Sequence, residues 1–284
     1  MKKMLKIIMV SGMAAFIIIT MGFSFISCRA SVSENGNAQT VLEKIIATKS
    51  VKVGIITTVP PHAYLDENNN PTGYDFKFAS ELGQSLAGED GEVEYVDLVT
   101  ENRVPAVQTG QVDLGVFVLG NFPARAKLIL YSTFPYFTLG IGVFSYADVQ
   151  IESAEDLAGL NVGVVKGTNG HEYIEAKGPE GININYFDDD VLQLNALLAG
   201  QLDAVTTSDA LADEMMKKYP DKNLEWKYTC FLSPVYVVTQ HGQYDLVNVI
   251  DSFIISNYYN GNLEMWWNEY MNIPFGPLPG VSIN

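Results

Sequence analysis

The chain has 284 residues, 33 of them acidic and 17 basic, and carries a formal net charge of −16 at pH 7. A protein with this much negative charge repels nucleic acid and anionic membrane surfaces. Neither is therefore expected as a binding partner. Two cysteines cannot build a zinc site, and His62, His171 and His241 have no metal-ligand spacing, so no metal and no cofactor are expected.

The N-terminal segment is a separate unit. Three lysines precede the uncharged run 7–27, which ends directly before Cys28. This pattern resembles a bacterial lipoprotein signal, in which residues 1–27 are removed and Cys28 is acylated. The alternative is an uncleaved anchor, because such a run could span a bilayer. Under either interpretation we expect an extracytoplasmic protein tethered to a bacterial membrane.

The first half of the remaining chain alternates strands and helices. We expect a short helix before residue 50, strands at 51–56, 93–98 and 112–119, helices at 74–86 and 101–109, and a hairpin tip at 66–71. In the helix at 74–86 the apolar residues recur at helical spacing. Alternation of this kind favours a parallel α/β sheet.

The second half repeats this arrangement. We expect strands at 161–165 and 203–207, helices at 189–199 and 208–218, a helix beginning near His171, and two helices within 243–271 separated at Gly261. The extended segments 136–146 and 231–240 are long enough to run from one lobe to another. The sequence therefore predicts an α/β protein of two lobes with a ligand cleft between them. Its expected parts are a tether and short helix at 28–49, lobe 1 at 50–140, lobe 2 at 141–232, and a return to lobe 1 with C-terminal helices at 233–284.

Arginine is scarce: only Arg29, Arg103 and Arg125 occur, against 14 lysines among the 17 basic residues. Arg29 lies beside the expected processing site, so the body retains two. A guanidinium is a planar, permanently charged fork that binds a carboxylate or phosphate through two parallel hydrogen bonds, which lysine cannot do. Either these positions bind an anion, or a bias toward lysine left two arginines by chance.

Short motifs recur in a recognisable order across residues 45–275. They are Pro60-Pro61, Gly73-Tyr74-Asp75, Asn102-Arg103-Val104-Pro105, Pro123-Ala124-Arg125, Val162-Gly163-Val164-Val165-Lys166-Gly167-Thr168 and Gly200-Gln201-Leu202-Asp203-Ala204. In this order the chain resembles the extracellular solute-binding proteins of polar amino-acid ABC transporters, bacterial family 3. The resemblance implies a type II periplasmic-binding-protein-like fold with two crossover hinge strands, a monomer, and a permease and ATPase complex as partner.

The resemblance also implies ligand-binding residues. Arg125 matches the arginine that holds the ligand α-carboxylate, and the Gly120 amide could add a donor. From the other lobe, Thr168 and Asn169 precede the helix near His171, where helix N-terminal amides favour an anion. Arg103 could hold a second carboxylate; the alternative is a surface pair with Glu101 or Asp97.

Three departures from the family pattern bear on the ligand. The acid that commonly holds the α-amino group is replaced by Ser208, which leaves the adjacent Asp209 as the candidate. The usual aromatic pair falls at Val59 and Thr100, so His62 and Tyr64 become the candidates for lining the pocket. Ile56 stands where members that bind cationic ligands carry an acid, so basic amino acids are not expected.

The expected function is that of a lipid-anchored binding component of an ABC importer, with a polar or acidic amino acid as ligand. The alternatives are a sensor module that signals through a partner protein and an enzyme similar to cyclohexadienyl dehydratase. No catalytic residue is expected, because no visible acid–base pair accompanies Glu172.

Overall fold

The computed structural model describes residues 39–280, and from Thr40 onward these form one compact unit. The expected lipidation site Cys28 and most of the tether lie outside the described residues. Within them, no helix combines the length and the apolar character needed to cross a bilayer.

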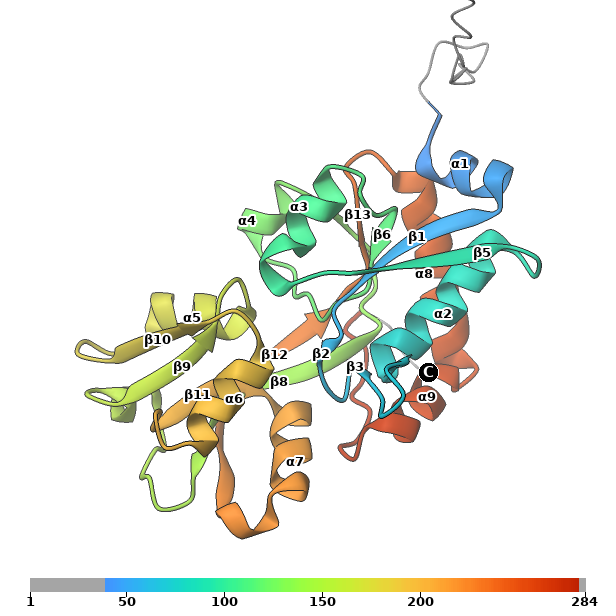
Figure 1. Cartoon of the computed structure of the whole chain (residues 1–284). Coiled ribbons are helices and arrows are strands. Elements are labelled where there is room, and N and C mark those ends of the chain that lie inside the picture. The colour runs from blue at the N-terminus through green and yellow to red at the C-terminus, as the bar shows by residue number, and fades with distance from the viewer. Residues whose placement is uncertain (1–38, 281–284) are drawn as a thin grey trace, which may run out of the picture. The chain divides into compact units, whose positions relative to one another are not determined.

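Lobe 1 is built on a five-stranded sheet in the order β5-β1-β6-β13-β7 (Figure 1). Its strands are β1 (Ser50–Ile55), β5 (Glu92–Asp97), β6 (Leu114–Gly115), β7 (Leu130–Tyr131) and β13 (Val238–Thr239). β1 pairs in parallel with β5 and β6, while β13 is antiparallel to β6 and β7. A small antiparallel sheet follows β1 and consists of β2 (Thr58–Val59), β3 (Ala63–Leu65) and β4 (Pro71–Thr72).

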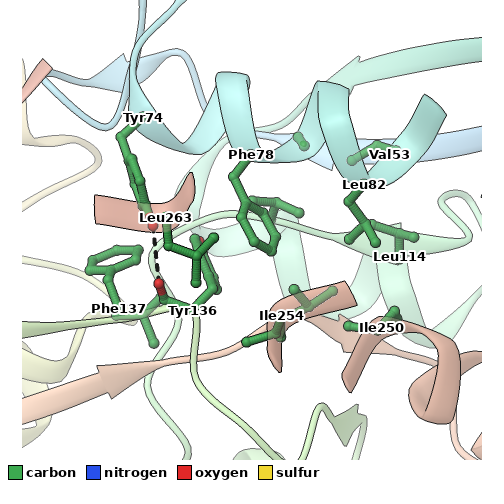
Figure 2. Close-up of a cluster of buried hydrophobic side chains, with 14 of the residues drawn as sticks. Val53, Tyr74, Phe78, Leu82, Leu114, Tyr136, Phe137, Ile250, Ile254 and Leu263 are labelled. Atoms are coloured by element: carbon green, nitrogen blue, oxygen red, sulfur yellow. Dashed lines mark hydrogen bonds between the residues drawn. The ribbon is translucent and has the colours of Figure 1, made fainter. Parts of the chain in front are cut away.

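Helices of lobe 1 supply its largest core. They are α1 (Val41–Thr48), α2 (Tyr74–Ala87), η1 (Thr100–Asn102), α3 (Arg103–Gln108), α4 (Pro123–Ala126), α8 (Tyr244–Tyr259) and α9 (Asn262–Tyr270). Tyr74, Phe78 and Leu82 share one face of α2 and are fully buried, pointing toward α8, α9 and the start of β8 (Figure 2). Full burial of each such side chain stabilises the fold by about 1.5–3 kcal/mol. The Tyr74 hydroxyl also donates to the Tyr136 carbonyl at 3.0 Å, next to the hinge.

Lobe 2 contains the second five-stranded sheet, in the order β10-β9-β11-β8-β12. Its elements are β8 (Phe137–Tyr146), η2 (Ala154–Leu157), β9 (Asn161–Val165), α5 (Asn169–Lys177), β10 (Asn183–Phe187), α6 (Asp190–Leu198), β11 (Ala204–Ser208), α7 (Asp209–Lys218), η3 (Pro220–Lys222) and β12 (Leu224–Val235). β9 is parallel to both β10 and β11. Parallel strands end at the same edge, so the helices that follow them begin at that edge.

Two long antiparallel strands connect the lobes. β8 and β12 pair from Phe137–Val235 to Tyr146–Leu224, and both pass between the two groups of elements in Figure 1. The α/β fold of two lobes joined by two crossover strands is thus confirmed. The expected lobe limits at 140/141 and 232/233 fall inside these strands and stay a prediction.

Two expected segments differ in extent. The strand expected at 112–119 spans only Leu114–Gly115, because Val118 adopts a left-handed backbone (φ 40°) that ends regular pairing. The segment expected at 231–240 instead starts earlier, since β12 begins at Leu224 and β13 is a separate short strand. β12 lies at the edge of its sheet and is half-exposed over its first residues, so its sequence lacks the continuous apolar run of a buried strand.

Candidate functional site

A cavity lies between the two sheets and is lined by residues of both lobes. Its volume is about 60 Å³, room for roughly four to six water molecules at 10–15 Å³ each. The lining residues are Val59, Thr100, Arg103, Val118, Leu139, Ile141, Thr168, Asn169, Gly170, Asp190, Thr206, Thr207, Ser208 and Leu211. Val59 and Thr100, where the family pattern has an aromatic pair, therefore do face the cavity.

Three helices of lobe 2 begin at this cavity. Their N-cap residues are Thr168, Asp189 and Ser208, and each side chain accepts a hydrogen bond from a backbone N–H of the first turn at 2.8–3.2 Å. Each cap stabilises its helix start by satisfying one N-terminal amide. The aligned peptide dipoles favour negative charge at the starts of these helices, and at α6 the Asp190 carboxylate occupies that position.

Arg103 reaches across the cleft from lobe 1. Its side chain is buried, at 5% exposed. Its Nη1 donates to the carbonyls of Phe117 (3.2 Å) and Val118 (3.4 Å). Its Nη2 donates to the carbonyl of Gly167 in lobe 2 at 2.6 Å. Burial, followed by the charge of Arg125, lowers the pKa of its guanidinium to about 9. No carboxylate among the described residues forms an ion pair with it.

The alternative surface pair for Arg103 is therefore wrong. Glu101 lies 3.8 Å from Lys166, and Asp97 accepts hydrogen bonds from the backbone and hydroxyl of Thr57. The side chain of Arg103 turns inward, because its carbonyl partners lie at the end of β6 and across the cleft.

Arg125 is also buried but already has a carboxylate. Its Nη2 lies 2.6 Å from Glu172 Oε1 and 3.0 Å from the Gly167 carbonyl, and its Nη1 donates to Asn169 Oδ1 at 2.9 Å. Arg125 does not line the cavity itself but contacts Asn169, which does. The expected clamp on a ligand carboxylate stays a prediction, and a ligand would have to share Arg125 with Glu172.

Gly120 lies next to Arg125 and in close contact with Asn169 of lobe 2. Its carbonyl accepts from Arg125 Nη1 and from the Tyr131 hydroxyl, both at 3.2 Å. A Cβ atom on Gly120 would lie 2.3 Å from Asn169 Nδ2 and 2.7 Å from Ser233 Oγ. A side chain at this position would therefore push the Asn169 amide, and lobe 2 with it, away from lobe 1.

Among the described residues that line the cavity, Asp190 carries the one carboxylate, and the sequence patterns did not indicate it. It is the first residue of α6, after the unexpected strand β10. Burial raises the pKa of its carboxyl to about 6, although the Arg103 charge opposes this. The acidic run Asp188-Asp189-Asp190 before an apolar segment was the available signal, since acids favour the first turn of a helix.

Three expected pocket residues lie elsewhere. His62 is fully buried in lobe 1, with Nδ1 3.6 Å from Asp75 Oδ1 and its ring stacked on Phe137 at 5.1 Å. Tyr64 lines a different cavity, near Lys218. The Asp209 carboxylate accepts from the Gly140 amide at 2.9 Å and faces a cavity beneath the proline-rich segment 273–279. The placement of all three thus differs from the expectation, while Ser208 does line the cleft.

The chain is similar to known proteins in both sequence and structure. The family model for bacterial extracellular solute-binding proteins, family 3, matches residues 51–273. A glutamine-binding protein of Geobacillus stearothermophilus is 27% identical over 194 residues, which cover 68% of this chain and 73% of that protein.

Two solved structures share the fold. The solute receptor for L-cysteine of Neisseria gonorrhoeae superimposes with a TM-score of 0.74 at 26% identity, covering 81% of this chain and 93% of that one. An ancestral amino-acid-binding protein, a precursor of cyclohexadienyl dehydratase, superimposes with a TM-score of 0.74 at 23% identity, covering 82% of this chain and 100% of that one. At that identity the second likeness concerns the fold alone.

Proposed function

Because the chain belongs to the bacterial extracellular solute-binding proteins of family 3, we propose that it is the substrate-binding component of an ABC importer that captures an amino acid between its lobes. The names of its relatives support this class of ligand, since they include a glutamine-binding protein and a receptor for L-cysteine.

The observation that carries the proposal is that Arg103 is buried and has no ion-paired carboxylate among the described residues. A buried cation without a carboxylate is unfavourable, and a ligand carboxylate in the cavity would pair with it. Arg103 already reaches Gly167 in the other lobe. A ligand held there contacts both lobes, so its binding energy favours the closed arrangement.

The charges of the cavity limit the side chain of the ligand. Among its described lining residues, Asp190 is the one acid, whereas an amino acid with a cationic side chain would present two cations. Ile56 is buried and supplies no further carboxylate. A polar or acidic amino acid therefore fits better than a basic one, and the small cavity favours a compact side chain.

The family and the N-terminal sequence support a proposal about where the protein works and with what partners. We propose an extracytoplasmic monomer, anchored through a lipid on Cys28, that delivers its ligand to a permease and ATPase complex. No catalytic role is proposed. A neighbouring sensor gene in place of permease and ATPase genes would favour the alternative of a signalling module.

A thermal-shift screen tests the proposal. The purified protein is heated with each of the 20 amino acids, with small dicarboxylates and with sugars as controls. Ligand present at 100 times its dissociation constant stabilises by about 2.7 kcal/mol, which shifts the melting temperature by several degrees. The proposal is wrong if no amino acid stabilises the protein at 10 mM or if a sugar does so instead.

A further inference from the structure

The cavity presents opposite charges on facing walls. Arg103 comes from α3 of lobe 1 and Asp190 from the start of α6 of lobe 2, and they are the two ionisable residues among its described lining. A ligand that carries one anionic and one cationic group could engage both walls at once. The geometry therefore distinguishes zwitterions from simple carboxylates.

In the acidic triplet Asp188-Asp189-Asp190, Asp190 is the member with no ion-pair or capping partner among residues 39–280. Asp188 pairs with Lys166 at 3.0 Å, and Asp189 caps α6 by accepting from the Leu192 amide at 2.8 Å. Within the described part of the chain, the Asp190 carboxylate has only its own backbone amide as a hydrogen-bond donor and forms no ion pair with a cation. A carboxylate that is half removed from water without a counter-ion is unfavourable until a cation binds beside it.

The adjacent wall offers further acceptors. Thr206 and Thr207, on β11 of the same lobe, are 4% and 6% exposed, and both hydroxyls are buried without a hydrogen-bond partner in the described part of the chain. Both residues line the cavity with Asp190. Orphaned buried hydroxyls of this kind indicate a missing polar partner. An ammonium has three donors to distribute between a carboxylate and neighbouring hydroxyls.

We propose that Asp190 accepts the α-ammonium group of the bound amino acid, and thereby makes the protein select amino acids over the corresponding α-hydroxy acids. The inference rests on the proposed function and adds the residue that reads the amino group. Asp209, the candidate from the sequence, bonds to the hinge strand at Gly140 and does not line this cavity. Ser208 faces the cavity but carries no charge.

The test compares the full chain with its Asp190→Asn variant. Asp188→Asn is the matched control, because it removes an equally charged residue two positions away that is 69% exposed. Each protein is first screened against the 20 amino acids by thermal shift. Calorimetry then uses the pairs L-aspartate/L-malate, L-glutamate/L-2-hydroxyglutarate and L-alanine/L-lactate.

We expect Asp190→Asn to weaken binding of every amino acid that binds the unaltered protein by roughly 100-fold or more, since the enclosed ammonium loses its counter-ion. Binding of the hydroxy acids should change less than threefold, and Asp188→Asn should match the unaltered chain. The inference is overturned if the unaltered protein binds amino acid and hydroxy acid equally, or if Asp190→Asn keeps both affinity and preference. A protein that binds no amino acid at all would instead overturn the proposed function. An unchanged near-UV spectrum of Asp190→Asn shows that lost binding does not reflect misfolding.

Discussion

Replacing Arg103 by methionine removes the buried cation while keeping most of the side-chain volume. A guanidinium pKa lowered from 12.5 to about 9 corresponds to burial that disfavours the cation by on the order of 5 kcal/mol, at about 1.4 kcal/mol per pKa unit. The three hydrogen bonds to carbonyls oppose this, at about 1.5–3 kcal/mol each. Because the two effects are similar in size, the ligand-free protein should change its free energy of unfolding by less than about 3 kcal/mol.

Ligand binding should respond much more strongly to this replacement. In the complex the cation pairs with the ligand carboxylate, and removing one partner of a buried pair costs about 3–5 kcal/mol. Affinity for the amino acid identified by the screen should therefore fall by several hundred- to several thousand-fold. Calorimetry measures the affinity, and urea denaturation measures the stability of the same sample.

Two further variants make this prediction refutable. Lys166→Met removes a cation whose side chain is 42% exposed near the cleft, and should alter affinity by less than about 1 kcal/mol. Glu172→Gln frees Arg125 from its carboxylate and should leave affinity within about tenfold. A folded Arg103→Met protein that binds within fivefold of the unaltered one refutes the role of Arg103. Tighter binding by Glu172→Gln would assign the ligand carboxylate to Arg125.

Three other predictions concern stability and closure. Asp190→Asn should stabilise the ligand-free protein at pH 7.5 but much less at pH 4.5. The pKa of Asp190 is raised to about 6 in the folded state, so its charge lowers stability progressively as pH rises from about 4 to 6. Equal melting-temperature differences between variant and unaltered protein at both pH values would contradict this. Gly120→Ala should weaken ligand binding by about 1–3 kcal/mol in calorimetry, since its Cβ meets Asn169 and keeps the lobes apart; unchanged affinity would show that the contact gives way. Asp75→Ala should lower the free energy of unfolding in urea by about 3–5 kcal/mol, because it strands the Tyr136 hydroxyl, the Val118 amide and His62, and a loss below 1 kcal/mol would be inconsistent with that network.

Local patterns in the sequence were sufficient for most of the fold. The helical spacing of Phe76, Ala79, Leu82 and Leu86 predicted α2, and the apolar run at 161–165 predicted β9, because burial requires side chains of one kind at a fixed spacing. The scarcity of arginine likewise indicated the two side chains that reach across the cleft. The family resemblance then implied two lobes joined by crossover strands, in agreement with the alternation of strands and helices.

The partners of those arginines were decided only by the tertiary structure. A guanidinium is equally suited to a ligand and to a protein carboxylate, and nothing in the sequence shows that Glu172 reaches Arg125 while Arg103 stays without an acid. The position of His62 was likewise decided by the tertiary structure, because it packs against Phe137 and Asp75, which lie more than ten positions away in the sequence.

Asp190 shows the limit most directly. Composition and local spacing in the sequence determined an α/β protein with two unusual cations, and the order of its motifs resembled the solute-binding family. Which of three consecutive aspartates faces the cavity depends on where β10 ends and at what angle α6 begins. Those quantities are set by packing between distant segments. Only the folded chain therefore distinguishes Asp189, which caps a helix, from Asp190, which lines the cavity.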